Sequence, residues 1–329
     1  MSYPAVSSQR NNKNAENTSR GGRRPVVRAE HLEEKGLRIA TYWWGGRRHV
    51  GRLSGDGKAV VPLALGDRAH AVGALALVEA MATDAREPRA AGASLPMAAI
   101  RLDAPIPVPR RNIFCSGVNY RAHAAEWAAS GLDAAPRAAG QEIPEHPVIF
   151  SKVPECVVAP GTPIRIPERA STAIDYEAEL AVIIGKQGRD IPASRAMAHV
   201  WGYTAFNDVT ARDLQRRHRQ WLIGKSLDTF GPMGPCLVSA DEVDGADTRV
   251  RCWVNAELRQ DARTRDLIFG IPELVAGISA GLTLYPGDII ATGTPSGVGI
   301  GFEPPRYLKR GDVVRIEIDG IGVLENPVQ

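Results

Sequence analysis

In one stretch of the chain, acidic residues alternate with uncharged ones and are followed by an unbroken run of apolar residues. Asp175, Glu177 and Glu179 alternate with uncharged residues, and the apolar run from Leu180 to Ile184 follows. Side chains of a strand repeat every two residues, so the three carboxylates are expected on one face. An unbroken apolar run is typical of a strand buried on both faces. The pattern therefore predicts a buried strand that begins in an acidic cluster.

Before this stretch, the chain shows short β patterns over residues 37–65, separated by glycine turns, and a helical pattern over 71–82. Prolines alternate at 105–109 and predict an extended linker, because proline fits neither a helix interior nor a central strand. Helical patterns recur later over 120–130, 193–199, 212–221 and 271–279. Strand patterns nevertheless outnumber helical ones. The fold class is therefore predicted as α+β, predominantly β.

These patterns predict three parts of the chain. A basic tail is expected at residues 1–30, a small N-terminal β-rich domain at 31–105, and a larger domain at 112–329. Residues 1–28 carry a local charge of +5 within a total of +3, which leaves −2 for the remainder. A polar, basic segment with almost no apolar residues predicts disorder.

Composition narrows the possible classes of protein. With 44% hydrophobic and 23% charged residues, the chain of 329 residues is typical of a soluble enzyme. It holds no apolar run of about 18 residues, which argues against a membrane span. Its four cysteines form no CxxC pair, which favours reduced thiols and a cytoplasmic location. Basic residues outside the tail are interleaved with acids, which argues against nucleic-acid binding.

The acidic cluster raises the question of what balances its charge. Carboxylates on one face repel one another, and a hard divalent cation such as Mg²⁺, Mn²⁺ or Ca²⁺ removes that repulsion. Asp208 offers a third ligand beside Glu177 and Glu179. An exposed acidic strand edge is the alternative that these residues leave open.

Four motifs accompany the cluster: GVNYRAHAAE (117–126), NDVTARDLQ (207–215), GKSLD (224–228) and PGDIIATGTP (286–295). In this order, with the cluster between the first two, they closely resemble the fumarylacetoacetate hydrolase family from about residue 112 to the C-terminus. The resemblance implies a β-roll catalytic domain, usually a homodimer, that binds Mg²⁺ or Mn²⁺. It also implies a small-molecule 2-oxo or 2,4-dioxo acid as substrate.

The resemblance further implies roles for single residues. The metal ligands are expected at Glu177, Glu179 and Asp208, with Asp175 beside them but not a ligand. The catalytic residues are expected at His123, Glu126 and Lys225. The substrate-binding residues are expected at Lys152, Arg212, Gln215 and Thr294.

The residues themselves support part of this assignment. His123 and Glu126 lie three positions apart on a predicted helix, so Glu126 can orient an imidazole that takes a proton from water. An ordinary surface pair is the alternative, and for Arg212 the alternative is a structural ion pair. Backbone amides of the glycine-rich turn after Thr292 could bind a carboxylate. Gly224 and Lys225 do not form a phosphate loop, because Arg219 stands where the first glycine is needed.

Three functions remain open. The first is a Mg²⁺- or Mn²⁺-dependent hydrolase that cleaves a C–C bond in a 2,4-dioxo acid of the acylpyruvate or fumarylacetoacetate kind. The second is a decarboxylase, isomerase or hydratase of a related 2-oxo acid of aromatic catabolism. The third is a catalytically silent metal-binding dimer. Asn119 stands where the founding member of the family has a fourth carboxylate, which leaves the substrate undecided.

Overall fold

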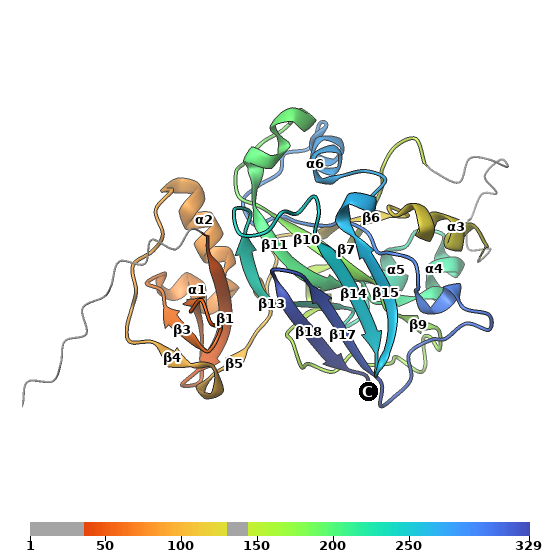
Figure 1. Cartoon of the computed structure of the whole chain (residues 1–329), viewed down its shortest axis with the longest axis horizontal. Helices are drawn as coiled ribbons and strands as arrows, with labels where there is room; N and C mark the ends of the chain where they lie inside the picture. Colours follow the sequence, from red (N-terminus) through yellow and green to blue (C-terminus); the bar gives the residue numbers. More distant parts are fainter. Residues whose placement is uncertain (1–35, 130–143) are drawn as a thin grey trace, which may run out of the picture. The chain divides into compact units, whose positions relative to one another are not determined.

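The computed structural model describes residues 36–129 and 144–329, which belong to one compact unit (Figure 1). The predicted tail at 1–30 lies outside the described residues. Strand pairing joins the described parts of the two predicted domains, at 31–105 and 112–329. Arg38 of the first lies opposite Val238 of the second in the same sheet. The division into domains at these boundaries stays a prediction.

Twelve strands of the described chain form one large sheet. They are β1 (Arg38–Trp44), β2 (Arg47–Leu53), β3 (Ala59–Pro62), β4 (Leu95–Pro96), β5 (Arg101–Leu102), β6 (Ile113–Gly117), β7 (Val148–Lys152), β8 (Val157–Val158), β10 (Ala178–Ile184), β11 (Val200–Asn207), β13 (Gly231–Ser239) and β16 (Ile289–Ala291). Ten of them follow in the order β4-β3-β2-β1-β13-β11-β10-β16-β6-β7, while β5 pairs with β1 and β8 with β13.

Two smaller sheets complete the strands of the described chain. The four-stranded sheet has the order β15-β14-β17-β18, with β14 (Arg249–Val254), β15 (Glu257–Arg263), β17 (Val313–Ile318) and β18 (Gly322–Pro327). The two-stranded sheet pairs β9 (Ile174–Asp175) with β12 (Thr210–Ala211). Both are antiparallel throughout.

The helices are few and short. They are α1 (Gly66–Val72), α2 (Leu75–Thr83), α3 (Arg121–Ala129), α4 (Arg212–His218), α5 (Leu222–Lys225) and α6 (Ile271–Ser279), with 3₁₀ turns η1 (Met97–Ala99), η2 (Pro154–Cys156), η3 (Ala193–His199), η4 (Thr264–Asp266) and η5 (Gly299–Gly301). Strands therefore outnumber helices, and the predicted class, predominantly β with some α, is confirmed.

Three helix predictions need correction. The helix predicted over 71–82 is divided at Gly73, whose φ of 63° interrupts the helical backbone. Its second half is α2. The helix predicted over 212–221 ends at His218, because Arg219 adopts a φ of 59°. The segment 193–199 is 3₁₀ and not α.

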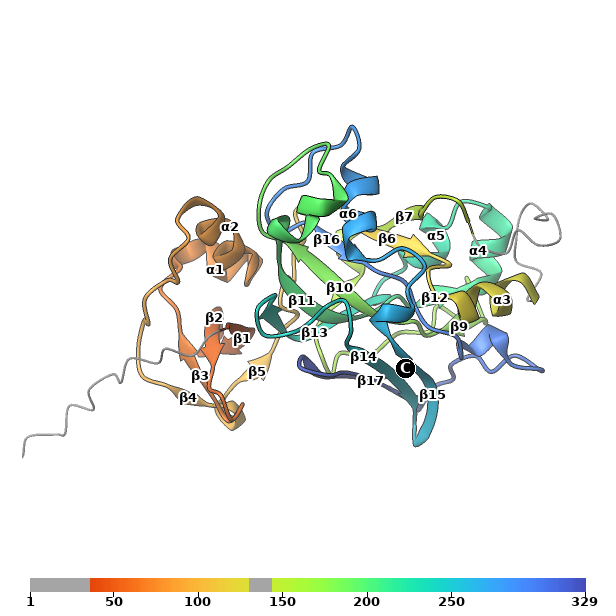
Figure 2. The same cartoon turned by 45° about the horizontal axis from the view of Figure 1, so that its top comes forward.

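Strand β10 is the centre of the fold, between β11 and β16 (Figure 2). All of its residues are buried, as the apolar run predicts. Leu180 and Val182 pack into one core, which also contains α6, and Ala181 and Ile183 pack into another, which contains α2. Because the strand has a core on each face, its position is fixed, and so are the acidic residues at its start.

Candidate functional site

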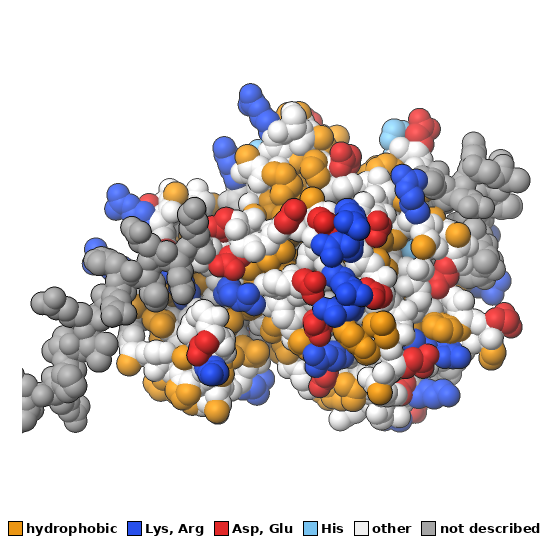
Figure 3. Space-filling view, viewed as in Figure 1, with side chains coloured by type: hydrophobic (Ala, Val, Ile, Leu, Met, Phe, Trp, Pro, Cys, Tyr) orange, Lys and Arg blue, Asp and Glu red, His pale blue; other side chains and the backbone are white. Residues whose placement is uncertain are grey.

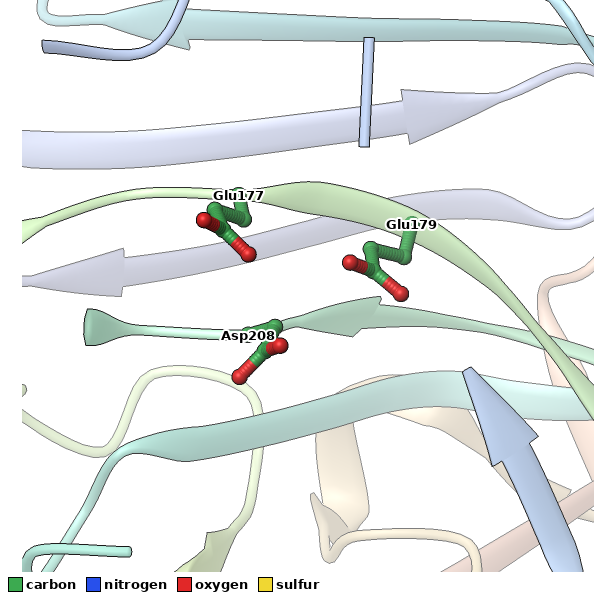
Figure 4. Close-up of side chains that lie close together, drawn as sticks. All are labelled: Glu177, Glu179 and Asp208. Carbon is green, nitrogen blue, oxygen red and sulfur yellow. The ribbon is translucent and has the colours of Figure 1, made fainter. Parts of the chain in front are cut away.

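The acidic cluster is assembled by strand register. In the pairing of β10 with β11, Ala178 lies opposite Asn207. The next pair continues the ladder, since the amide of Asp208 donates to the carbonyl of Glu177 (2.9 Å). Residues opposite each other in an antiparallel pair share a face. Glu177, Glu179 and Asp208 therefore face one another (Figure 4).

These three carboxylates fit a divalent cation. Each offers a ligand oxygen, the three oxygens lie within 4.8 Å of one another, and all three side chains are buried. Burial and the neighbouring charges of Asp208 and Glu177 raise the pKa of Glu179 well above its usual value. Hard oxygen ligands of this kind suit Mg²⁺, Mn²⁺ or Ca²⁺, and a bound cation would remove the repulsion. The triad could hold a divalent metal.

Buried cations surround the cluster. Lys225 Nζ donates to Glu177 Oε2 (2.6 Å) and to Asp208 Oδ2 (2.8 Å). Arg212 lies 2.7 Å from Glu177 Oε1. Burial alone would raise the pKa of Glu177, but Lys225 and Arg212 outweigh it and lower the pKa to about 2. Three buried basic side chains, Lys225, Arg212 and Lys152, thus lie around the three carboxylates of the cluster.

The third cation is Lys152, which lies behind the cluster. Its Nζ is 2.7 Å from Asp208 Oδ1, close enough for an ion pair although not aligned for a hydrogen bond. It also donates to the carbonyls of Val209 (3.0 Å) and Lys225. Lys152 is fully buried. A small pocket lies over Glu177 and Glu179, and Lys152 is not among the residues that line it. Its contact with substrate stays a prediction.

Helix α3 carries the predicted proton-transfer pair. His123 Nδ1 lies 2.9 Å from Glu126 Oε2, so the two side chains meet as the spacing predicts. His123 lines a pocket of about 10 Å³ over the acids, which is room for about one water. The pocket is lined by Ser116, Gly117, Val118, His123, Phe150, Glu177, Glu179, Gln215, Trp221, Lys225 and Thr294.

Arg212 contacts Asp175 and Gln215 as well as Glu177. It donates from Nε to Asp175 (2.8 Å) and from a terminal nitrogen to Gln215 (3.2 Å). Together with Glu126 it lines a neighbouring cavity of about 580 Å³ and not the small pocket. The ion-pair alternative for Arg212 is therefore present in the structure. Asp175 was expected on one strand face with Glu177 and Glu179, but it lies in β9, which pairs with β12 in a separate sheet, because the chain leaves the strand between Asp175 and Ala178. It is not part of the three-carboxylate cluster.

The glycine-rich turn after β16 binds carboxylates of the protein itself. The amide of Gly293 donates to Glu179 Oε2 (2.8 Å), and the amide of Gly297 donates to Glu126 Oε1 (3.0 Å). The Thr294 hydroxyl donates to the carbonyl of Ala178 (3.0 Å). These donors were expected to bind a substrate carboxylate. Thr294 nevertheless lines the pocket, so its substrate contact stays a prediction.

The structural roles of two residues, Asn119 and Gln260, were not predicted from the sequence. Asn119 donates to the carbonyls of Phe269 and Thr292 and accepts from the Phe269 amide (2.8–2.9 Å). Gln260 donates to Thr294 and accepts from the Ala178 amide. Both are buried side-chain amides that join segments far apart in the sequence. Composition and spacing give no signal for such contacts.

Comparison with known proteins identifies the class. Residues 112–329 match the family described as Fumarylacetoacetate (FAA) hydrolase C-terminal, and the chain belongs to that family. No helix of the described residues has the length and apolar character to cross a membrane.

Named relatives carry more than one activity. The chain is 50% identical over 230 residues to oxaloacetate tautomerase YisK of Bacillus subtilis (strain 168). The aligned region covers 70% of this chain and 73% of that protein. A solved fumarylacetoacetate hydrolase from psychrophilic Exiguobacterium antarcticum is 38% identical, with a TM-score of 0.74 over 89% of this chain and 99% of the other. The 2-hydroxyhepta-2,4-diene-1,7-dioate isomerase of Mycobacterium marinum is 34% identical, with a TM-score of 0.70 over 89% and 98%. The fold is therefore that of the family, while hydrolase and isomerase activities both occur among similar proteins.

Proposed function

We propose that the chain is a divalent-metal-dependent tautomerase of a small 2-oxo acid, with oxaloacetate as the first candidate substrate. The reaction moves one proton between C3 and the oxygen on C2 and consumes no water. The relative named oxaloacetate tautomerase, 50% identical over 230 residues, supports this choice over hydrolysis. The proposed homodimer and cytoplasmic location accompany it as predictions.

The observation that carries the proposal is the geometry of His123 and Lys225: His123 Nδ1 lies 2.9 Å from Glu126 Oε2, and Lys225 Nζ donates to Glu177 and Asp208. Burial favours the neutral amine, but Asp208 and Glu177 outweigh it and raise the pKa of Lys225. Lys225 Nζ already donates to two carboxylates, so we assign it the role of a hydrogen-bond donor and not of a base. Histidine is the side-chain type that gains and loses a proton near neutral pH. His123 is the pocket residue suited to carry the proton.

We assign roles to the other residues that their contacts support. Glu177, Glu179 and Asp208 would hold a Mg²⁺ or Mn²⁺ ion, which supplies a positive charge for the oxygens of a 2-oxo acid. Glu126 accepts from His123 Nδ1 and so leaves Nε2 to take the proton from C3 and return it to oxygen. The Lys225 ammonium stabilises the negative charge that develops between these two transfers.

Hydrolysis of a 2,4-dioxo acid is the second candidate. The fold similarity to a fumarylacetoacetate hydrolase, with 38% identity, favours it. The same His123–Glu126 pair could take a proton from water instead of from carbon. Tautomerisation and hydrolysis then differ in their products, because only hydrolysis breaks a C–C bond.

The test is turnover of oxaloacetate and acetylpyruvate with Mg²⁺, with Mn²⁺ and with EDTA. We expect EDTA-sensitive acceleration of oxaloacetate enol-to-keto conversion, followed in the ultraviolet, without release of CO₂ or pyruvate. Replacing His123 with Ala should lower this rate by about 10²–10⁴-fold, while metal-induced thermal stabilisation is retained. Release of pyruvate and acetate from acetylpyruvate, with no tautomerisation, would replace the proposal by the hydrolase. Release of CO₂ would replace it by a decarboxylase.

A further inference from the structure

Residues 297–301 form a backbone shelf between two acidic side chains. On one side, the amide of Gly297 donates to Glu126 Oε1 (3.0 Å). On the other side, the amides of Gly299 (2.6 Å) and Ile300 (3.0 Å) donate to the two oxygens of Asp175. Asp175 is fully buried, so this side of the shelf is fixed within the core. Glu126 belongs to helix α3, so the shelf is the point where α3 meets the loop.

Glu126 uses both of its carboxylate oxygens at once. Oε1 accepts from the Gly297 amide, and Oε2 lies 2.9 Å from His123 Nδ1. A carboxylate that makes two hydrogen bonds has a fixed position. The imidazole that it contacts then has a fixed orientation as well. The orientation of His123 therefore depends on whether Glu126 can reach the shelf.

The space for Glu126 exists because position 301 is a glycine. An ideal Cβ at Gly301 would overlap Oε1 and Cδ of Glu126 and lie 2.6 Å from its Cγ. All three nearest atoms belong to Glu126. The φ of Gly301 lies outside the left-handed region, so its backbone does not require glycine. The absence of a side chain at position 301 therefore leaves the space that the Glu126 carboxylate occupies.

We propose that Gly301 is a positioning residue, which keeps open the space where Glu126 binds the Gly297 amide and orients His123. The inference rests on the proposed function, because it assigns His123 the proton transfer. A side chain at 301 would move the Glu126 carboxylate without breaking the core. The neighbouring cavity of about 580 Å³, which both residues line, offers room for the displaced group.

The test is Gly301→Ala in the metal-loaded, full-length protein. Gly92→Ala is the matched control, since no described atom lies within 4 Å of an ideal Cβ there and its φ is also outside the left-handed region. We expect both variants to keep the unfolding midpoint and the metal-induced thermal shift. Gly301→Ala alone should lower kcat/KM by about 10²-fold, the scale of a 1 Å misplacement of a catalytic group.

A double variant separates positioning from a general structural role. In a Glu126→Ala background the Cβ at 301 meets no carboxylate, so adding Gly301→Ala should cause no further loss of activity. A full additive loss in that background would overturn the inference. Wild-type activity in the Gly301→Ala single variant would also overturn it.

A spectroscopic measurement keeps the inference testable if oxaloacetate is not the substrate. With ¹⁵N-labelled histidine, the His123 ring signals can be assigned by their loss in a His123→Ala variant. We expect Gly301→Ala to shift them to the positions seen in Glu126→Ala. Unchanged His123 signals would overturn the positioning role, whichever reaction the wild-type enzyme catalyses. Failure of wild-type tautomerisation with shifted signals would instead reject only the proposed function.

Discussion

The protein contains two networks of ion pairs that use the same residue types and differ in their contact with water. In the interior, Arg212 and Asp175 pair at 2.8 Å with side chains 1% and 0% exposed. On the four-stranded sheet, Arg251 and Glu317 pair at 2.9 Å with side chains 22% and 29% exposed. Figure 3 shows basic and acidic side chains interleaved over the face where β14, β15 and β17 lie. The two pairs have nearly the same separation, but only the pair on the four-stranded sheet is exposed to water.

The difference shows why the distance between two charges alone does not determine how much an ion pair contributes to stability. Exposed pairs contribute about 0–1 kcal/mol, because water and salt screen them. Breaking a buried pair costs about 3–5 kcal/mol, because one charge is left without water or partner. The interior network is therefore sensitive to each of its members, and the surface network is tolerant. The predictions below test this contrast.

The largest effect is expected for Asp175→Asn. Asp175 accepts from Arg212, from the amides of Gly299 and Ile300, and from the amide of Tyr176. Asparagine offers one acceptor oxygen and directs an N–H group at donors. We expect a loss of about 3–5 kcal/mol in the free energy of unfolding, measured by urea denaturation. A loss below about 1 kcal/mol would mean that the interior pair is no more valuable than a surface pair.

This contrast also explains what could be predicted from the sequence. The alternation of Asp175, Glu177 and Glu179 and the apolar run after them indicate a buried acidic strand, because period and polarity are local properties. The residues suggested Glu177, Glu179 and Asp208 as metal ligands, and the family resemblance implies the same three. The contacts of Lys152, Asn119 and the residue 297–301 shelf depend on which strands become neighbours, and neither pattern nor composition specifies that register.

The next effect concerns metal binding and Glu179. Glutamine at this position has the same shape and no ionisable group, so it avoids the burial and the repulsion by Asp208 and Glu177 that raise the pKa of Glu179, and the metal-free protein should be as stable as the wild type or more stable. The metal-induced gain should disappear, whereas the wild type should gain about 2.7 kcal/mol at a metal concentration of 100 times Kd. Thermal unfolding with Mg²⁺ or Mn²⁺ and with EDTA measures both quantities. An undiminished shift in Glu179→Gln would remove this residue from the metal site.

The smallest effect is expected for Glu317→Gln on the surface. Glu317 accepts from Arg251 (2.9 Å) and from Arg315 (3.1 Å), but both arginines have other acidic neighbours. Its charge is shared and solvated, so the free energy of unfolding should fall by only about 0.2–1 kcal/mol. The difference from wild type should shrink further in 1 M salt, where the Debye length is about 3 Å. A loss above about 2 kcal/mol that salt does not reduce would show that this face is shielded from water, as the covered interface of the predicted homodimer would be.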